Sequence, residues 1–210
     1  MPKQEAPLEY LRQFIPHAAV PRVLEYLQLY KVHLTITRER KTVLGDYRHA
    51  AGQKTHRISV NGTLNPYTFL ITLVHEIAHL VTFMQYGNRV QSHGREWKNC
   101  YALLLKDFLQ KGIFPALVEQ ALLKSMHDLP ASSCADEDLM RVLKQYDRVQ
   151  NGLVMVEQLA EGQLFDTGEG RLFKKGKQLR KRFQCTEVET GRVYLFSPIY
   201  EVKLAERKTG

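Results

Sequence analysis

The sequence from residue 65 to residue 97 reads NPYTFLITLVHEIAHLVTFMQYGNRVQSHGREW, and its first two-thirds predict one long helix. Asn65 is a residue type that caps helix N-termini, and proline is favoured at the first helical position, which Pro66 would occupy. Gly87 marks the C-terminal end, at about residue 85. Apolar residues at helical spacing form a stripe that should face a core: Leu70, Leu73, Val74, Ile77, Val81 and Met84.

The same helix carries the motif HEIAH at residues 75–79. Histidines four residues apart lie on one helix face, so the His75 and His79 rings can reach one metal ion. Both lie two residues from Ile77, which is about 200° around the helix, so they should point away from the apolar stripe and toward a cleft. Glu76 sits beside that face, where a general base can accept a proton from a zinc-bound water.

A catalytic zinc takes three protein ligands, so a third is expected outside the helix. The metzincin pattern would need glycine at position 82 and histidine at position 85, where the chain has threonine and glutamine. Glu96 is an alternative, although the ExxxD spacing that usually accompanies a glutamate ligand would need aspartate in place of Cys100. His93 is the remaining candidate, because the chain can turn back at Gly87 and begin a second helix beside the first. As a surface histidine that caps a helix, His93 would play no part in the site.

Patterns on either side of this stretch predict a helical domain with a small sheet. Residues 7–31 predict two short helices, and alternating apolar and polar residues predict strands over 32–37, 47–50 and 56–60, the last two joined through residues 51–53. Further helices are expected at about 93–112, 115–126 and 135–148. The strand at 56–60 is either an edge strand that aligns an extended substrate or a plain interior strand.

The character of the chain changes after Asn151-Gly152. Short apolar runs separated by glycines predict a small antiparallel β module over residues 151–210, which leaves residues 1–150 as the first domain. One stretch, residues 174–182, has six basic residues among nine and a phenylalanine on each side. These cations could grip a phosphate backbone or form a solvated hairpin: Lys174, Lys175, Lys177, Arg180, Lys181 and Arg182.

Composition limits the class of protein. The 210 residues are 44% hydrophobic and 25% charged, which is typical of a soluble globular protein. Three widely spaced cysteines without a CxxC pair argue against a disulfide framework and against a cysteine-built zinc ribbon. The first residues lack the apolar core of a secretory signal, and no uninterrupted apolar run reaches the length of a membrane span, so a cytoplasmic protein is expected. The net charge of +8 favours a polyanionic partner such as DNA.

HEIAH, followed by HGREW at residues 93–97, resembles the HExxH and downstream HGxxW/F motifs of the SprT-like metalloprotease family. The resemblance implies that His75, His79 and His93 bind one catalytic zinc ion, with Glu76 as the general base and Trp97 packing behind the third ligand. It also implies proteolysis of DNA-associated or DNA-crosslinked proteins, a role in DNA repair. Family members often carry a C-terminal zinc ribbon with four cysteines, whereas this chain has one cysteine in that place, so a metal-free module of similar size is expected.

Together these observations predict a cytoplasmic zinc endopeptidase of α+β fold. A zincin-like helical domain with a small antiparallel sheet would be followed by a small β-rich module. The substrates would be proteins or peptides, DNA is the expected partner, and the oligomeric state stays open. The alternative is a nucleic-acid-binding or scaffolding protein with a structural or vestigial metal site, which would need no general base at position 76. A zinc aminopeptidase would need an acidic pocket for the substrate amine.

Overall fold

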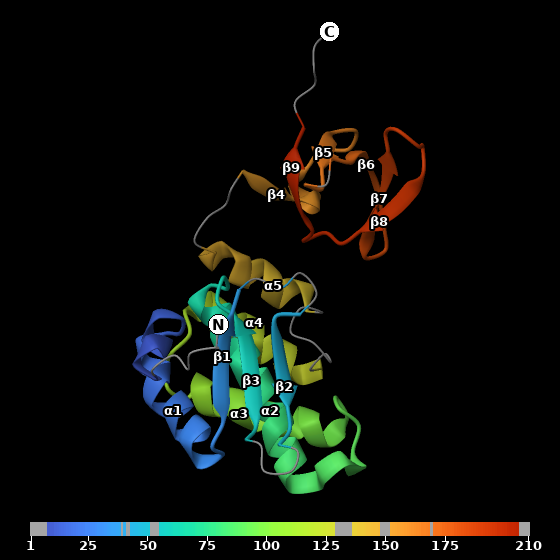
Figure 1. Ribbon diagram of the computed structural model, residues 1–210. Coiled ribbons are helices and arrows are strands. Elements are labelled where there is room, and N and C mark those ends of the chain that lie inside the picture. The colour runs from blue at the N-terminus through green and yellow to red at the C-terminus, as the bar shows by residue number, and fades with distance from the viewer. Residues whose placement is uncertain are drawn as a thin grey trace, which may run out of the picture. The chain divides into compact units, whose positions relative to one another are not determined.

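The computed structural model describes residues 8–38, 40, 43–50, 55–128, 136–147, 152–168 and 170–205. The chain divides into two compact units between residues 147 and 148 (Figure 1). Each unit has its own hydrophobic core.

Helices make up most of the first unit, and they form where apolar residues recur at helical spacing. The predicted helix pair at residues 7–31 consists of two 3-10 helices and one α-helix: η1 (Leu8–Gln13), η2 (His17–Ala19) and α1 (Val20–Leu29). The motif helix α2 covers Pro66–Tyr86 and is followed by the 3-10 turn η3 (Gly87–Arg89). The remaining helices are α3 (Arg95–Leu109), α4 (Ala116–Ser125), η4 (Met126–Asp128), α5 (Glu137–Leu143) and η6 (Lys144–Tyr146). The predicted ends of the last helix, residues 135 and 148, lie outside the described residues.

A three-stranded sheet lies beside α2 in the order β1–β3–β2, with β1 at His33–Thr37, β2 at Gly45–Arg48 and β3 at Arg57–Asn61 (Figure 1). β2 runs antiparallel to β3, as predicted, but β1 runs parallel to β3, so the expected antiparallel sheet is in fact mixed. The parallel pair arises because the chain crosses from β1 to the far edge and then returns through the middle position. β3 is therefore an interior strand, and the edge-strand interpretation of residues 56–60 is wrong. The predicted connection through residues 51–53 lies outside the described residues.

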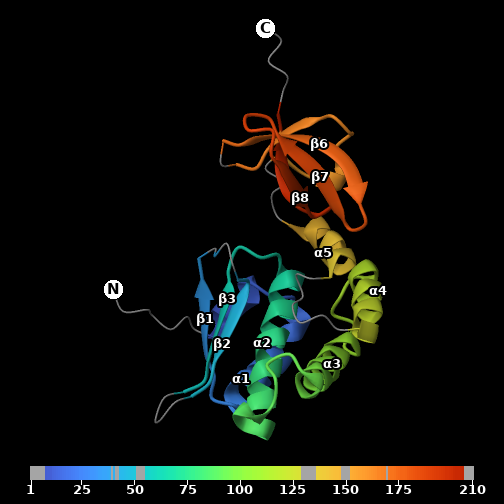
Figure 2. The same ribbon diagram turned by 90° about the vertical axis from the view of Figure 1, so that its right-hand side faces the viewer.

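Helix α2 begins as its sequence predicts and is buried along most of its length. The Asn65 side chain accepts hydrogen bonds from the N–H groups of Tyr67 and Thr68 at 3.1 and 3.0 Å, and Pro66 opens the helix. Every residue from Thr68 to Ala78 is buried, because the sheet packs against one side and α3 against another (Figure 2). In the described part of the chain, α2 with η3 is the one helix that matches a membrane span in length and composition, contrary to expectation. However, 78% of its most apolar window is buried, as in the core helix of a domain.

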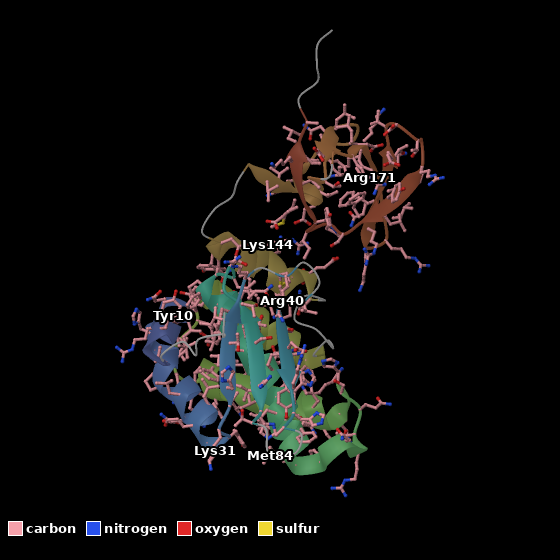
Figure 3. All side chains as sticks on the ribbon, in the orientation of Figure 1. Tyr10, Lys31, Arg40, Met84, Lys144 and Arg171 are labelled. Atoms are coloured by element: carbon pink, nitrogen blue, oxygen red, sulfur yellow. The ribbon has the colours of Figure 1, made fainter. Side chains whose placement is uncertain are left out.

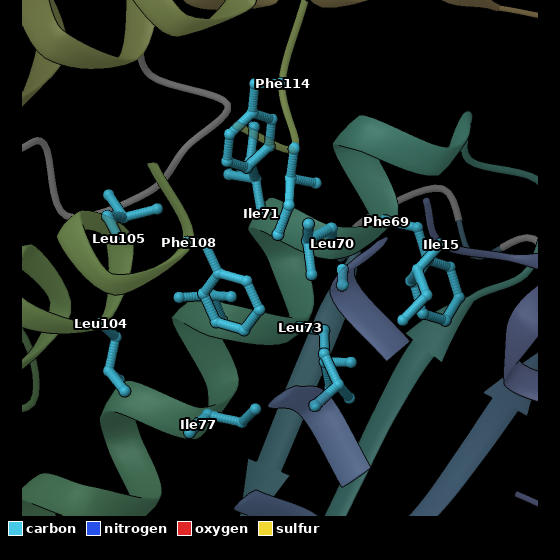
Figure 4. Packing of buried hydrophobic residues seen from close by; sticks show 14 of the residues in the cluster. Ile15, Phe69, Leu70, Ile71, Leu73, Ile77, Leu104, Leu105, Phe108 and Phe114 are labelled. Carbon is cyan, nitrogen blue, oxygen red and sulfur yellow. The ribbon is translucent and has the colours of Figure 1, made fainter. Parts of the chain in front are cut away.

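The predicted apolar stripe is only partly right. Leu73 and Ile77 pack with Phe69 and Phe108 in the core (Figure 4). Met84, which lies at the C-terminal end of the stripe (Figure 3), is 55% exposed, and residues 84–86 are all exposed. The face that carries the histidines is not open to solvent along its length either, because His75 is only 9% exposed. The spacing of apolar residues predicted one buried face of α2, whereas the sheet and α3 together bury most of its circumference.

The second unit is a curled six-stranded sheet in the order β4–β9–β5–β6–β7–β8 (Figures 1 and 2). Its strands are β4 (Leu153–Met155), β5 (Leu164–Asp166), β6 (Leu172–Leu179), β7 (Arg182–Glu187), β8 (Val193–Phe196) and β9 (Glu201–Leu204), with the short 3-10 helix η7 (Val156–Gln158). Every pairing is antiparallel, as predicted. Buried side chains from the strands, from η7 and from the residue after η7 form its core: Val156, Leu159, Phe165, Phe173, Cys185 and Val202.

Candidate metal centre

Three imidazole rings meet at one point in the first unit. His75 and His79 lie one turn apart on α2, and His93 lies between η3 and α3. The Nε2 atom of His75 is 3.2 Å from Nε2 of His79 and 3.4 Å from Nε2 of His93. Among the described residues, this is the one group of three His, Cys, Asp or Glu side chains whose ligand atoms all lie within 4.8 Å of one another. The structure therefore brings together all three predicted ligands.

The spacing of these nitrogen atoms fits one small divalent cation. A metal ion such as zinc binds imidazole nitrogen at about 2.0–2.1 Å with tetrahedral angles, which places neighbouring ligand atoms about 3.3 Å apart. The separations of 3.2 and 3.4 Å lie on either side of that value. Three neutral imidazoles cannot all satisfy their Nε2 atoms by hydrogen bonds to one another at a single point, whereas one cation satisfies all three lone pairs. Imidazole donors suit several transition metals, zinc among them.

Burial keeps the three rings uncharged at neutral pH. Burial, followed by the charges of His79 and His93, lowers the pKa of His75 from 6.5 to about 3. Burial, with the charge of His93 as the second cause, lowers the pKa of His79 to about 4, and burial also lowers the pKa of His93. Because a metal ion binds the unprotonated imidazole, protons compete for this site only at acidic pH.

Trp97 on α3 packs against all three rings. Its ring centroid lies 4.7 Å from those of His75 and His93 and 5.2 Å from that of His79, and the side chain is fully buried. Trp97 thus supports the whole cluster, not the third histidine alone. The Nδ1 atom of His75 has no hydrogen-bond partner among the described residues. With its proton on Nδ1, His75 directs the Nε2 lone pair toward the other two rings, which is the tautomer that ligation requires.

Glu76 is 6% exposed and lies against the first residue of β2. A Cβ atom on Gly45 would lie 2.6 Å from Oε1 of Glu76, so only glycine fits where the strand passes the carboxyl group. Burial, followed by the charge of Asp46, raises the pKa of Glu76 from 4.5 to about 8, against the opposing charge of Arg40. A divalent cation held by the imidazoles would favour the carboxylate and lower this pKa again.

Aromatic side chains around His79 complete the site, and they were not predicted from the sequence. The Tyr47 ring is nearly parallel to the His79 ring at an interplanar angle of 2°, with the centroids 6.5 Å apart. The Tyr47 hydroxyl lies 2.9 Å from Nδ1 of His56. Phe83, one turn beyond His79, packs against Tyr47, His56 and His49. Alternation along the predicted strand at 47–50 places Tyr47 and His49 on one side, which is the signal that could have found them.

A cavity of about 210 Å³ opens beside His79. It is lined by ten residues: Tyr47, His49, His79, Thr82, Phe83, Gly87, Asn88, Val90, Gln91 and Ser92. None of the ten is an aspartate, glutamate, lysine or arginine. The metal centre therefore adjoins a small cavity whose walls carry no carboxylate and no permanent positive charge.

The six predicted nucleic-acid-binding residues lie in the second unit, on β6, on β7 and in the turn between them. Five of them are exposed: Lys174, Lys177, Arg180, Lys181 and Arg182. Lys175 is only 5% exposed, because alternation along β6 turns it inward. Its ammonium group donates hydrogen bonds to the carbonyl oxygens of Glu157 and Leu159 and lies 4.1 Å from the centre of the Phe183 ring. The prediction of Lys175 as a surface contact is therefore wrong.

Comparisons with known proteins match part of the chain, and the family match lies in the first unit. The SprT-like family model matches residues 13–108, which include all three histidines and Glu76. Proteins SprT of Pseudomonas putida strains F1 and KT2440 are each 29% identical to the chain over 70 residues, and Protein SprT of strain W619 is 27% identical over 70 residues. Each match covers 33% of this chain, which spans only 29% of the length of these relatives. No solved structure matches the chain.

Proposed function

We propose that this chain, which belongs to the SprT-like family through residues 13–108, is a zinc-dependent endopeptidase with a zincin-like catalytic domain. One observation carries the proposal: three imidazole nitrogens converge beside a buried carboxyl group. Three protein ligands leave a coordination position for water or substrate, whereas structural zinc sites are closed by four. A structural or vestigial site would have no use for Glu76, so the arrangement favours an enzyme over a scaffolding protein.

His75, His79 and His93 would hold the ion, and zinc bound there would polarise the scissile carbonyl and acidify a water molecule. Glu76 takes the proton from the attacking water and returns it to the leaving amine. Burial raises the pKa of its carboxyl group and so the basicity of the carboxylate, and the charge of a bound cation would keep it deprotonated and able to accept the proton. Trp97 keeps the imidazole rings in their ligating orientation through its contacts with all three.

Strand β2 is the element best placed to align a substrate. It pairs with β3 on one side, and no other described strand pairs with its outer edge. Gly45 on this strand contacts Glu76, and Tyr47 contacts His79, so the edge runs beside the reacting groups. An extended peptide that adds to this edge would be held through backbone hydrogen bonds, with little dependence on its sequence. We assign to β2 the role that the sequence suggested for residues 56–60.

Two variants and a metal assay test the proposed function. Purified protein should contain about one zinc ion per chain, and His93→Ala should lose most of it. Glu76→Gln should keep the metal and lose casein hydrolysis by about 10²–10⁴-fold, because the ligands remain and the base does not. Normal hydrolysis by Glu76→Gln would refute the base, and full zinc content in His93→Ala would refute the site.

We further propose that the substrates are proteins associated with or crosslinked to DNA, and that the exposed cations of the β6–β7 hairpin contact the nucleic acid. The tip of this hairpin carries Arg180, Lys181 and Arg182, all exposed. Binding to single-stranded DNA should weaken as salt rises, and Arg180→Ala with Lys181→Ala should reduce the salt slope by about one unit per residue. Casein assays with and without this DNA would show whether it activates hydrolysis. Binding that ignores salt would exclude a phosphate contact at the hairpin.

A further inference from the structure

The cavity beside His79 is formed by three separate parts of the first unit. One wall comes from β2 and the residue that follows it, a second from the last turns of α2, and the third from the segment 87–92 that leads to His93. His79 itself is part of the lining. Any group that enters the cavity therefore lies directly beside the metal centre.

The walls present apolar surface and neutral polar groups. Phe83 stacks on His49 with ring centroids 4.7 Å apart, and Tyr47 and Val90 add further apolar area. The Thr82 hydroxyl already donates its proton to the carbonyl oxygen of Ala78 at 2.7 Å. The lining offers an entering ammonium or carboxylate group no charged side chain of opposite sign, so such a group would lose water without that compensation.

The size of the cavity fits a single amino-acid side chain. Its volume of about 210 Å³ corresponds to roughly seven water molecules at about 30 Å³ each. Pockets for drug-sized ligands occupy about 300–1,000 Å³, so a whole small molecule would not be enclosed. An extended peptide on the edge of β2 sends alternate side chains to one face, and one of them can fill this space.

We infer that this cavity is a specificity pocket that takes one uncharged, apolar side chain, preferably aromatic or leucine-sized, next to the scissile bond. The inference rests on the proposed peptidase function and adds a substrate preference to it. Backbone pairing along β2 would select extended chains in general, and the pocket would select the position of the cut. The absence of a carboxylate from its lining gives a free substrate amine no partner there, which favours cleavage within a chain.

The test separates binding from cleavage. Fluorescein-labelled peptides of glycine, serine and alanine would differ at one central residue: Phe, Leu, Ala, Lys or Glu. Their affinities for the full-length, zinc-loaded Glu76→Gln protein are measured by fluorescence anisotropy, and cleavage positions with the wild-type protein by mass spectrometry. The Phe and Leu peptides should bind at least about tenfold more tightly than the other three. Wild-type cuts should lie next to the variable residue.

A charge change supplies the matched control. Val90→Asp places a carboxylate in the lining. The affinity for the Lys peptide, relative to that for the Phe peptide, should therefore rise at least about tenfold. Met84→Asp adds the same charge to an exposed position of α2 outside the lining and should leave the preference unchanged.

Each outcome bears on one claim. Equal affinity for all five peptides, or no response to Val90→Asp, overturns the pocket, while cleavage by the wild-type protein would still support the peptidase. Selective binding without any cleavage overturns the peptidase and keeps the pocket. Failure of every peptide to bind overturns both.

Discussion

At the residue scale, Gly45 lets the backbone of β2 pass directly against the carboxyl group of Glu76. We expect Gly45→Ala to push Glu76 out of place, because the new Cβ would lie 2.6 Å from Oε1 and 2.8 Å from Cγ2 of Thr72. Zinc content should stay the same while casein hydrolysis falls by about 10²-fold, as misplacement of a catalytic group by about 1 Å can do. Gly112→Ala is the control, since nothing lies within 4 Å of its Cβ and its φ of +60° predicts only backbone strain. Full activity in Gly45→Ala would contradict the proposed place of Glu76 in the reaction.

The Trp97 ring packs against all three imidazole rings. Trp97→Ala should lower the free energy of unfolding by about 3–5 kcal/mol, because it leaves a cavity in the core. Trp97→Phe keeps an aromatic ring and should fold, but with weaker zinc binding than the wild type. Urea unfolding and competition with a zinc chelator measure the two effects. Wild-type zinc affinity in a folded Trp97→Phe protein would show that the ring does not position the ligands.

Two of the three histidines, and Glu76, could be predicted because their geometry is local to one helix. His93 needed the additional assumption that the chain turns back after Gly87. Gly45 and Tyr47 could not be predicted, because their contact with the site depends on where β2 lies in the sheet. Residue patterns within a strand do not carry that information.

At the scale of elements, Asn65 joins the start of α2 to the end of α5. Its carbonyl oxygen caps α2, while its amide donates to the carbonyl oxygen of Leu143 at 2.9 Å and to Oδ1 of Asp147 at 2.7 Å. Asn65→Ala should therefore destabilise the first unit by about 2–3 kcal/mol, from the lost cap and the unpaired buried groups.

Asn65→Asp distinguishes the two functions of this side chain. It keeps the cap for α2 but replaces the amide donor by a charge beside Asp147, so it should also destabilise at neutral pH and recover as the pH falls. Urea unfolding at pH 7 and pH 4 measures both variants. An Asn65→Asp protein as stable as the wild type at pH 7 would show that the link to α5 contributes little.

The helices were predictable from period and capping residues, and their order along the chain agrees with the structure. The direction of β1 relative to β3 could not be predicted, because a strand has the same alternating pattern whether its neighbour is parallel or antiparallel. The burial of α2 was underestimated for a related reason: Thr68, Thr72 and His75 are polar, yet α3 and the sheet cover them. The spacing of apolar residues predicts the helix face that packs against the core, but it does not predict the burial of a second face that carries polar residues.

At the scale of the whole molecule, the metal-free protein should be most stable near pH 6.5. From about pH 4 to 6.5, His75 and His79 bind protons only when unfolded, because burial lowers their folded pKa to about 3 and about 4. From about pH 4.5 to 8, Glu76 binds its proton more tightly when folded, because burial raises its pKa to about 8. Below pH 6.5, the two imidazoles that take up protons on unfolding outnumber the one carboxyl group that releases a proton, so the free energy of unfolding rises with pH. Above pH 6.5, only the protonation of Glu76 still differs between the two states, so the free energy of unfolding falls as the pH rises.

Urea unfolding in the presence of a chelator at pH 5, 6.5 and 8 measures this profile. The change on each side should be on the order of 1 kcal/mol. Glu76→Gln should remove the fall between pH 6.5 and 8 and leave the acidic side in place. A profile that rises steadily to pH 8 in the wild-type protein would show that Glu76 is not protonated in the folded state.

Lys175 carries its ammonium group into the interior of the second unit, where backbone oxygens of Glu157 and Leu159 surround it. This ammonium group is part of the polypeptide chain, so, unlike a bound metal ion, it can be neither removed by a chelator nor exchanged. Under the proposed function, metal depletion would abolish hydrolysis by the first unit and leave the fold of the second unit intact. EDTA should therefore leave the β-sheet circular dichroism of the second unit unaltered, and the proposed contact between its hairpin and DNA should persist.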